Sequence, residues 1–141
     1  MTDKLIIGNL ELCDLPELGI SDLKVRVDTG AKTSSLHVDN IRTFKIGRKP
    51  AVRFDLHPHI HNVDTVVECE ALLMDIRRIK SSNGAAEQRY VIRTPIVMGG
   101  RSWPIEITLT DRSDMSYLML LGREGMSDLL VDPSRAFLLS E

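Results

Sequence analysis

This sequence is short of cysteine and of long apolar runs, and each shortage excludes a class of protein. Its two cysteines, Cys13 and Cys69, lie in apolar strand-like surroundings. We expect buried, reduced thiols, as in a cytoplasmic protein, with a single disulfide as the alternative. No stretch approaches the roughly 18 apolar residues that span a bilayer, and the first ten residues do not read as a signal peptide. We therefore expect no membrane segment.

The sequence also lacks an excess of basic residues. It has 18 Lys and Arg against 20 Asp and Glu, a net charge of -2 and a pI near 6.1. A general nucleic-acid binder would normally be basic, so we expect no nucleic-acid partner, although local basic patches remain open. Repeats, linkers and low-complexity segments are absent from the 141 residues. The chain is therefore expected to form one domain over residues 1–141.

Short runs of β-branched and apolar residues, separated by turn residues, dominate the chain and predict an all-β fold. A hairpin turn is expected at Gly8-Asn9, inside the first run. One short helix is expected over residues 123–129, ended by Asp132-Pro133. Many short strands with one late helix indicate a closed or nearly closed β-fold. Strands are expected at residues 5–12, 22–27, 41–46, 51–56, 63–79, 88–98, 103–110 and 137–139.

The turn that follows the strand over residues 22–27 has a specific chemical interpretation. There a buried apolar strand delivers the Asp28 carboxylate to a tight turn in which Gly30 allows close approach of the backbone. Beside a second aspartate, such a group cannot ionise independently. Two carboxylates sharing a proton supply a base for a water and an acid for the carbonyl oxygen. Since Asp-x-Gly turns are common, an ordinary turn is the alternative for this tripeptide alone.

Two motifs at opposite ends of the chain carry a family resemblance. Residues 118–124 read Leu-Met-Leu-Leu-Gly-Arg-Glu, an apolar strand that runs into a Gly-Arg-acid turn. Together with Asp-Thr-Gly-Ala at residues 28–31, this order and spacing resemble the retropepsin family of dimeric aspartic proteases. The segments 27–37 and 87–94 look like the bacterial retropepsin-like family linked to RimK-type glutamate ligases. That family is often labelled an ATP-dependent zinc protease.

The resemblance implies a closed pepsin-like acid-protease barrel with one short C-terminal helix. It also implies that Asp28 is the catalytic acid/base, and that Thr29 and Gly30 shape its loop. Because the chain contains one Asp-Thr-Gly, a dyad would require a homodimer with one Asp28 from each subunit. The residues expected to support the site are Ala31, Gly122, Arg123 and Glu124.

Two positions depart from the retropepsin pattern. Many retropepsins place an acid two residues after the glycine, where it pairs with the later arginine. Here that position is Lys32, and the residue after Arg123 is Glu124. A swapped ion pair between Lys32 and Glu124 is our hypothesis for how the two loops stay joined. The glycine-rich flap is also missing, and residues 81–84 are the expected hairpin tip over the site.

The histidines at positions 57, 59 and 61 suggest a different chemistry. On a regular strand His57, His59 and His61 would project from one face, as in several zinc sites. Against this, Pro58 interrupts the strand pattern, and no His-Glu-x-x-His helix or nearby cysteine supports a metal. A polar loop is the favoured interpretation, so no cofactor is assigned and zinc is kept as an alternative. The residues give little support to the zinc and ATP of the family label.

Lys32 and Arg89 are the two basic residues that we assign to the substrate. At the cleft, Lys32 would pair with acidic side chains, in agreement with the resemblance, which links the family to proteins bearing added glutamates. Solvated strand faces are the alternative for the basic residues. The predicted function is a cytoplasmic aspartic peptidase acting on glutamate-extended tails, with a glutamate ligase as a further partner. The alternatives are a zinc peptidase and a non-catalytic module that binds acidic tails or the ligase.

Overall fold

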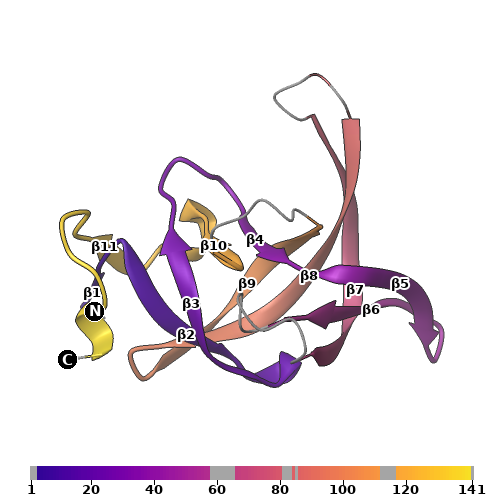
Figure 1. The fold of residues 1–141 in the computed structure, drawn as a ribbon, viewed down its shortest axis with the longest axis horizontal. Coiled ribbons are helices and arrows are strands. Elements are labelled where there is room, and N and C mark those ends of the chain that lie inside the picture. Colours follow the sequence, from indigo (N-terminus) through magenta and orange to yellow (C-terminus); the bar gives the residue numbers. More distant parts are fainter. Residues whose placement is uncertain (1–2, 58–65, 81–83, 85, 112–116, 141) are drawn as a thin grey trace.

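The structure is a computed structural model, and it describes residues 3–57, 66–80, 84, 86–111 and 117–140. The described residues form strands joined by turns and by short 3-10 helices (Figure 1). Among them, no helix has the length and apolar character needed to cross a bilayer. In chain order the elements are β1 (Leu5–Ile7), β2 (Leu10–Leu15), η1 (Pro16–Leu18), β3 (Ile20–Val27), β4 (Ser34–His37), β5 (Asp39–Ile46), β6 (Lys49–Leu56), β7 (Val67–Lys80), β8 (Ala86–Met98), β9 (Arg101–Thr110), β10 (Met119–Leu121), η2 (Arg123–Gly125), β11 (Leu129–Val131) and η3 (Leu138–Ser140).

Six of the strands close into a barrel. Hydrogen-bonded neighbours follow the order β2-β3-β10-β4-β9-β8, and a pairing of Asp14 with Val97 joins β2 back to β8. The β3–β10 and β4–β9 pairs are parallel, whereas the other barrel pairs are antiparallel. Closure pairs the backbone groups that an open sheet would leave unpaired at its edges. The expected closed β-barrel is therefore confirmed.

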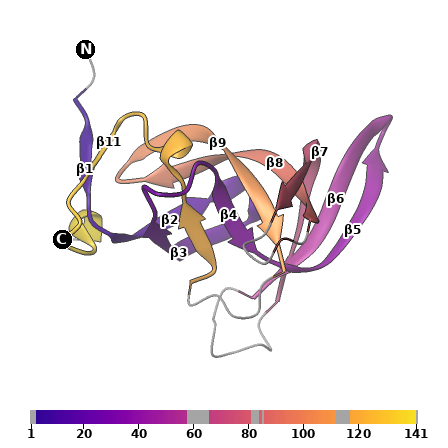
Figure 2. The same ribbon diagram turned by 90° about the horizontal axis from the view of Figure 1, so that it is seen from above.

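Three more strands continue the sheet from β8 in the order β7-β6-β5. The β7–β8 hairpin rises beyond the barrel, and the β5–β6 hairpin projects from it to one side (Figures 1 and 2). β7 contains a register shift between Leu73 and Asp75, as a β-bulge produces. The strand expected over residues 63–79 is confirmed from Val67 onward, and its first three residues lie outside the described residues.

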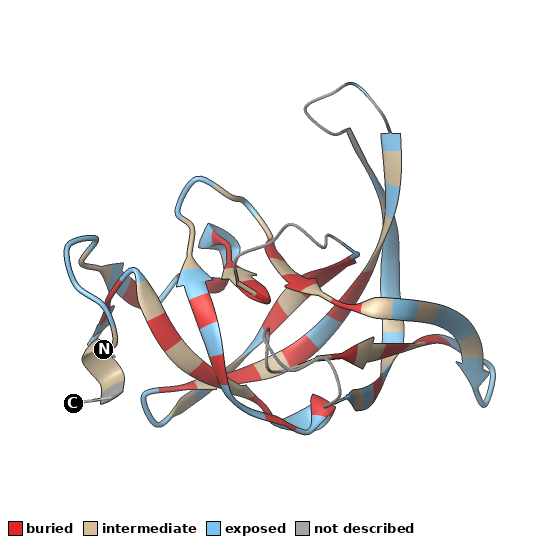
Figure 3. Cartoon of the chain, in the orientation of Figure 1, coloured by how far each residue is buried: buried red, intermediate tan, exposed pale blue. Residues whose placement is uncertain are grey.

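Alternate residues of the strands fill the barrel. In β3, Leu23 and Val25 are buried while Lys24 and Arg26 are exposed, as the alternation in sequence predicts. Figure 3 shows the same alternation along the other barrel strands. The core therefore lies inside the barrel, and its largest fully buried side chains include Leu15, Leu36, Ile92, Ile96, Ile107, Leu109, Met119 and Leu121.

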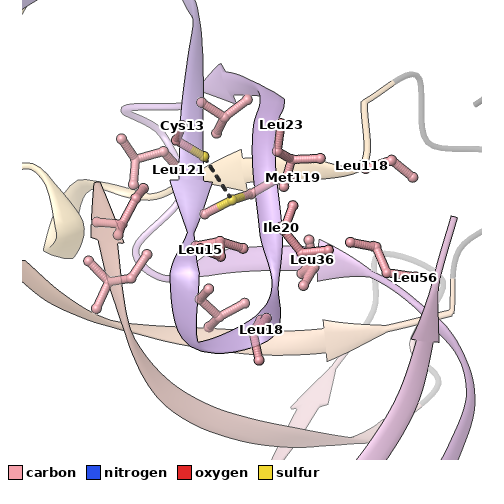
Figure 4. Packing of buried hydrophobic residues seen from close by; sticks show 14 of the residues in the cluster. Cys13, Leu15, Leu18, Ile20, Leu23, Leu36, Leu56, Leu118, Met119 and Leu121 are labelled. Carbon is pink, nitrogen blue, oxygen red and sulfur yellow. Dashed lines mark hydrogen bonds between the residues drawn. The ribbon is translucent and has the colours of Figure 1, made fainter. Parts of the chain in front are cut away.

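Both cysteines are buried and unpaired, as expected. The Sγ of Cys13 lies 3.9 Å from the Sδ of Met119 in the core (Figure 4). Burial, helped by the nearby Asp14 carboxylate, raises the pKa of the Cys13 thiol to about 12. Burial, together with two neighbouring carboxylates, raises the pKa of Cys69 to about 11. Both thiols therefore stay protonated at neutral pH, which makes them poor nucleophiles.

The predicted hairpin at Gly8-Asn9 is wrong, because the strands on either side belong to different sheets. β1 pairs in parallel with β11, with Ile6 opposite Leu130, while β2 belongs to the barrel. Gly8 is needed for close approach rather than for a turn. A Cβ added there would lie 2.5 Å from the carbonyl oxygen of Arg135.

A buried glutamate ties this terminal sheet to the barrel. Glu11 of β2 is fully buried, and its Oε2 accepts hydrogen bonds from the N–H groups of Gly8 at 2.7 Å and Leu138 at 2.9 Å. Its Oε1 accepts a third from the N–H of Leu139 at 3.2 Å. One carboxylate therefore joins the segments before β2 and at the end of the chain.

The helix expected over residues 123–129 is corrected to a single 3-10 turn, η2, at Arg123–Gly125. The chain then enters β11, where Leu129 is buried opposite Leu5 of β1. Pairing with a distant strand thus replaces the local helical preference. The strand expected over residues 137–139 is also wrong, since this segment ends in η3.

Candidate active site

The Asp28 turn lies where two parallel strands end side by side. In the β3–β10 pair Val27 is opposite Leu121, so the residues that follow them, Asp28 and Gly122, emerge at the same edge. The Asp28 N–H donates a hydrogen bond to the carbonyl oxygen of Leu121 at 2.9 Å. Strand pairing therefore brings together the two motifs that lie at opposite ends of the sequence.

Within the turn, the backbone folds around the Asp28 side chain. The Gly30 N–H donates to the Asp28 Oδ1 at 3.0 Å, and the Ala31 N–H donates to the Asp28 carbonyl oxygen at 3.2 Å. A Cβ added at Gly30 would lie 3.3 Å from the same Oδ1, so the glycine permits this approach. Asp28 itself is half-buried. Its carboxylate is thus held in one orientation by the loop that carries it.

The Gly122-Arg123 turn supports that loop from below through backbone contacts. The Arg123 N–H donates to the carbonyl oxygen of Ala31 at 2.9 Å. The Arg123 Nη1 lies 3.4 Å from the carbonyl oxygen of Thr29 and 3.3 Å from that of Gly30. The contact between Thr29 and Arg123 therefore uses the backbone carbonyl of Thr29.

Gly122 is a glycine because no side chain fits at its position. A Cβ there would lie 2.5 Å from the carbonyl carbon of Thr33 and 2.9 Å from the backbone nitrogen of Ser34. Such distances fall below van der Waals contact with backbone atoms, which cannot move aside easily. The two motifs therefore depend on each other sterically as well as through hydrogen bonds.

Residues 6–141 match the family described as "RimB-like: Retropepsin-like aspartic endopeptidase RimB". This chain belongs to the RimB-like family. The resemblance inferred from residues 28–31 and 118–124 is therefore confirmed.

Relatives and solved structures agree with this assignment. A probable alpha-L-glutamate ligase of Shewanella pealeana is 51% identical over 140 residues, which cover 99% of this chain and 31% of that protein. One from Desulfotalea psychrophila is 48% identical over 139 residues, covering 98% and 30%. The RimB-like chain thus spans under a third of these relatives. A crystal structure of a Legionella pneumophila protein of unknown function superposes with a TM-score of 0.80 and 28% identity, covering 96% of this chain and 98% of that one.

The hypothesised ion pair of this RimB-like chain is present. The Nζ of Lys32 lies 3.8 Å from the Oε1 of Glu124, and the Glu124 N–H donates to the Lys32 carbonyl oxygen at 3.1 Å. The two side chains are 72% and 48% exposed, so water and salt screen their attraction. Such a pair contributes little to stability. The backbone bond at the same two residues is the firmer connection.

Arg89 lies on β8, in the hairpin that rises beyond the barrel, opposite Arg77 of β7. Its side chain is 13% exposed, and its Nη2 lies 3.6 Å from the Oε2 of Glu87. The contacts of the Asp28 turn given above do not include Arg89. Its assignment to the substrate therefore stays a prediction that these contacts do not strengthen.

His57 is half-buried, and its Nε2 lies 3.1 Å from the Oδ2 of Asp39. His59, His61 and the first three residues of the hairpin tip expected at 81–84 lie outside the described residues. Within the described part of the chain, no three His, Cys, Asp or Glu side chains are grouped so that they could hold a metal ion. His57 is thus engaged by a carboxylate, and nothing described supports a zinc site.

A hollow of about 230 Å³ lies beside η2. Arg93, Ile105 and Glu106 contribute to its lining from the barrel, and Glu124 and Gly125 contribute from η2. Trp103 is half-buried, and its Nε1 donates to the carbonyl oxygen of Gly125 at 3.0 Å. η2 therefore lines the hollow and also supports the Asp28 loop.

Sequence reasoning missed Ser34, although the alternation of β4 contained a signal. Ser34 and Leu36 are both buried, whereas Ser35 and His37 are half-buried. A serine at an inward strand position needs a hydrogen-bond partner. That partner is the N–H of Gly122, at 3.0 Å from the Ser34 Oγ.

Proposed function

We propose that this chain is an aspartic peptidase in which Asp28 activates the water that attacks the substrate's peptide carbonyl. The observation that carries the proposal is the geometry of the turn. The Gly30 N–H orients the Asp28 carboxylate, and the Gly122-Arg123 turn backs the loop. Membership of a family of retropepsin-like aspartic endopeptidases supports this interpretation.

The mechanism needs a second carboxylate, which we propose comes from Asp28 of a second copy in a homodimer. The two carboxylates share one proton. The ionised carboxylate takes a proton from water while the oxygen of that water attacks the carbonyl carbon. The protonated carboxylate donates to the carbonyl oxygen. The tetrahedral intermediate then collapses: the first carboxylate gives the proton it took from water to the nitrogen, and the C–N bond breaks. The second carboxylate takes back a hydroxyl proton as the carbonyl re-forms, so the free amine leaves and the shared proton is restored. Neither step forms a covalent bond to the enzyme.

We propose glutamate-extended protein tails as the substrate class. Lys32 is 72% exposed and lies in the loop that follows Asp28, where an acidic side chain could pair with it. The probable alpha-L-glutamate ligases contain a region whose sequence is about 50% identical to that of this chain. A ligase that adds glutamates and a peptidase that removes them would act on the same tails, so a ligase is also the proposed partner.

Asp28→Asn tests the aspartyl mechanism. Asparagine keeps the size of the side chain and can still accept from the Gly30 N–H, but it cannot act as a base. We expect cleavage of a glutamate-extended peptide to fall by about 10²- to 10⁴-fold, with the melting temperature and solution mass unchanged. Asp128→Asn, at an exposed aspartate beyond η2, is the matched control and should cleave normally. Turnover that persists in Asp28→Asn would exclude the aspartyl mechanism.

A non-catalytic module that binds acidic tails or a ligase is the second candidate. The presence of one Asp-Thr-Gly per chain favours it, because a monomer would contain half of a dyad. Solution mass measured across concentration, with cleavage assayed on each sample, separates the two. A dimer whose formation tracks cleavage supports the peptidase. A monomer that binds the glutamate-extended peptide and leaves it intact supports the binding module.

A further inference from the structure

We propose that Ser34 is a positioning residue that fixes the Gly122-Arg123 turn beneath the Asp28 loop. Ser34 is the first residue of β4 and is 2% exposed. Its Oγ accepts a hydrogen bond from the Gly122 N–H at 3.0 Å. Gly122 is also buried, so this N–H would otherwise lack a partner away from water.

The position of Ser34 is fixed from its other side by β9. Thr108 of β9 is buried, and its Oγ1 donates to the carbonyl oxygen of Ser34 at 3.2 Å. The parallel pairing of β4 with β9 places Ser34 opposite Ile107. Gly125 adjoins the hydroxyl, since a Cβ added there would lie 3.6 Å from the Ser34 Oγ. Ser34 thus joins the barrel wall to η2.

Gly122 transmits this position to the catalytic loop through its neighbours. Immediately before it, the Leu121 carbonyl accepts the Asp28 N–H, and immediately after it, the Arg123 N–H donates to the Ala31 carbonyl. Both ends of the 28–31 turn are therefore hydrogen-bonded to residues adjacent to Gly122. A shift of Gly122 moves Asp28, and a misplacement of about 1 Å can cost about 100-fold in rate.

A purely structural role for Ser34 makes a different prediction. If the hydroxyl only satisfies a buried N–H, its removal lowers stability without altering the Asp28 loop. If it positions the turn, its removal releases the Gly30 N–H, which donates to the Asp28 Oδ1. Hydrogen exchange at Gly30 thus distinguishes the two roles. Hydrogen exchange at Gly30 can be measured whether or not the protein is a peptidase. Only the measurement of kcat and KM rests on the proposed peptidase activity.

The experiment measures amide hydrogen exchange by NMR in the wild type, Ser34→Ala, Ser34→Thr and Ser35→Ala. For Ser34→Ala we expect exchange to accelerate at least about tenfold at both Gly122 and Gly30, while the amides of β2 and β8 keep their rates. Ser34→Thr retains a hydroxyl and should restore both rates. Ser35→Ala removes a hydroxyl from the next residue on the half-buried face of β4 and should leave both unchanged. Unaltered exchange at Gly30 in Ser34→Ala overturns the proposal.

On a glutamate-extended peptide, we expect Ser34→Ala to lower kcat by about 10- to 100-fold and to leave KM within about twofold. Ser34→Thr should recover most of the rate. An unchanged kcat alongside faster exchange at Gly122 would reduce Ser34 to a structural role and overturn the proposal. If the wild type does not cleave, the peptidase proposal fails, and exchange at Gly30 alone decides the role of Ser34.

Discussion

Removing the Glu11 carboxylate is expected to destabilise this protein more than most single substitutions. Glu11→Ala deletes the acceptor of three backbone N–H groups, at distances of 2.7, 2.9 and 3.2 Å. Those donors belong to Gly8, between β1 and β2, and to Leu138 and Leu139 in η3. Since Glu11 is fully buried, the alanine leaves a cavity that has no polar group to replace the carboxylate.

The magnitude follows from the number of donors left without a partner. A buried hydrogen-bonding group that loses its partner costs about 1–3 kcal/mol. Gly8 is covered by the chain at Arg135 and Ala136, while Leu138 and Leu139 are half-buried and can regain some hydration. We therefore expect Glu11→Ala to lower the free energy of unfolding by about 3–5 kcal/mol. Glu11→Gln keeps one acceptor oxygen and should cost roughly half as much.

Equilibrium unfolding in urea measures this loss directly. The midpoint should fall, while the slope stays near the wild-type value because the exposed surface does not change. Glu17→Ala, at an exposed glutamate in η1, is the control and should remain within about 0.5 kcal/mol of wild type. A loss below about 1 kcal/mol in Glu11→Ala would refute the reasoning. It would mean that water or a local rearrangement satisfies the three donors.

Two further predictions concern buried positions. Gly122→Ala should lower the free energy of unfolding by about 2 kcal/mol, because the added Cβ meets the Thr33 backbone at 2.5 Å. Gly19→Ala, where φ is +73° but space is open, should cost about 1 kcal/mol; equal losses in the two urea experiments would contradict the steric argument. Cys13 should make stability fall as pH rises from about 9 towards 12, because its folded pKa of about 12 lies above the unfolded value near 9. Comparing pH 8 with pH 10, Cys13→Ala should lose about 1 kcal/mol less than wild type, and identical losses would show that another group is responsible.

Alternation along single strands made most of the fold predictable. Leu23 and Val25 in β3, and every second residue from Ile92 to Met98 in β8, are buried, so a local pattern was sufficient to identify both strands. The closed barrel followed from the number of short strands and the scarcity of helical signals. Strand order did not follow, because the parallel pairing of β3 with β10 joins segments far apart in sequence.

The errors occurred where distant segments determine the local structure. Gly8-Asn9 has the composition of a hairpin turn, yet Gly8 is required by the approach of Arg135. Residues 126–129 were expected to continue a helix from residue 123. Pairing of Leu129 with Leu5 decides that they leave η2 for a strand.

Both motifs of the candidate site could be identified from the amino-acid sequence alone. The signals are local: Asp28 lies two residues before a glycine, and Gly122 lies directly before an arginine. Both can be recognised without knowing how the chain packs. The Lys32–Glu124 pair could be hypothesised in advance because Lys32 stands where many retropepsins have an acid that pairs with the later arginine, and Glu124 directly follows that arginine. These properties are encoded by residue type and spacing.

How those motifs are held depends on contacts between distant strands. Ser34 supports Gly122, and Glu11 connects the two ends of the chain. Both do so through hydrogen bonds to backbone N–H groups, which do not depend on residue type. Any residue except proline can present such an N–H, so the partner of a buried hydroxyl or carboxylate cannot be read from residue types. The sequence determines which side chains must be satisfied, and the packing of distant strands determines what satisfies them.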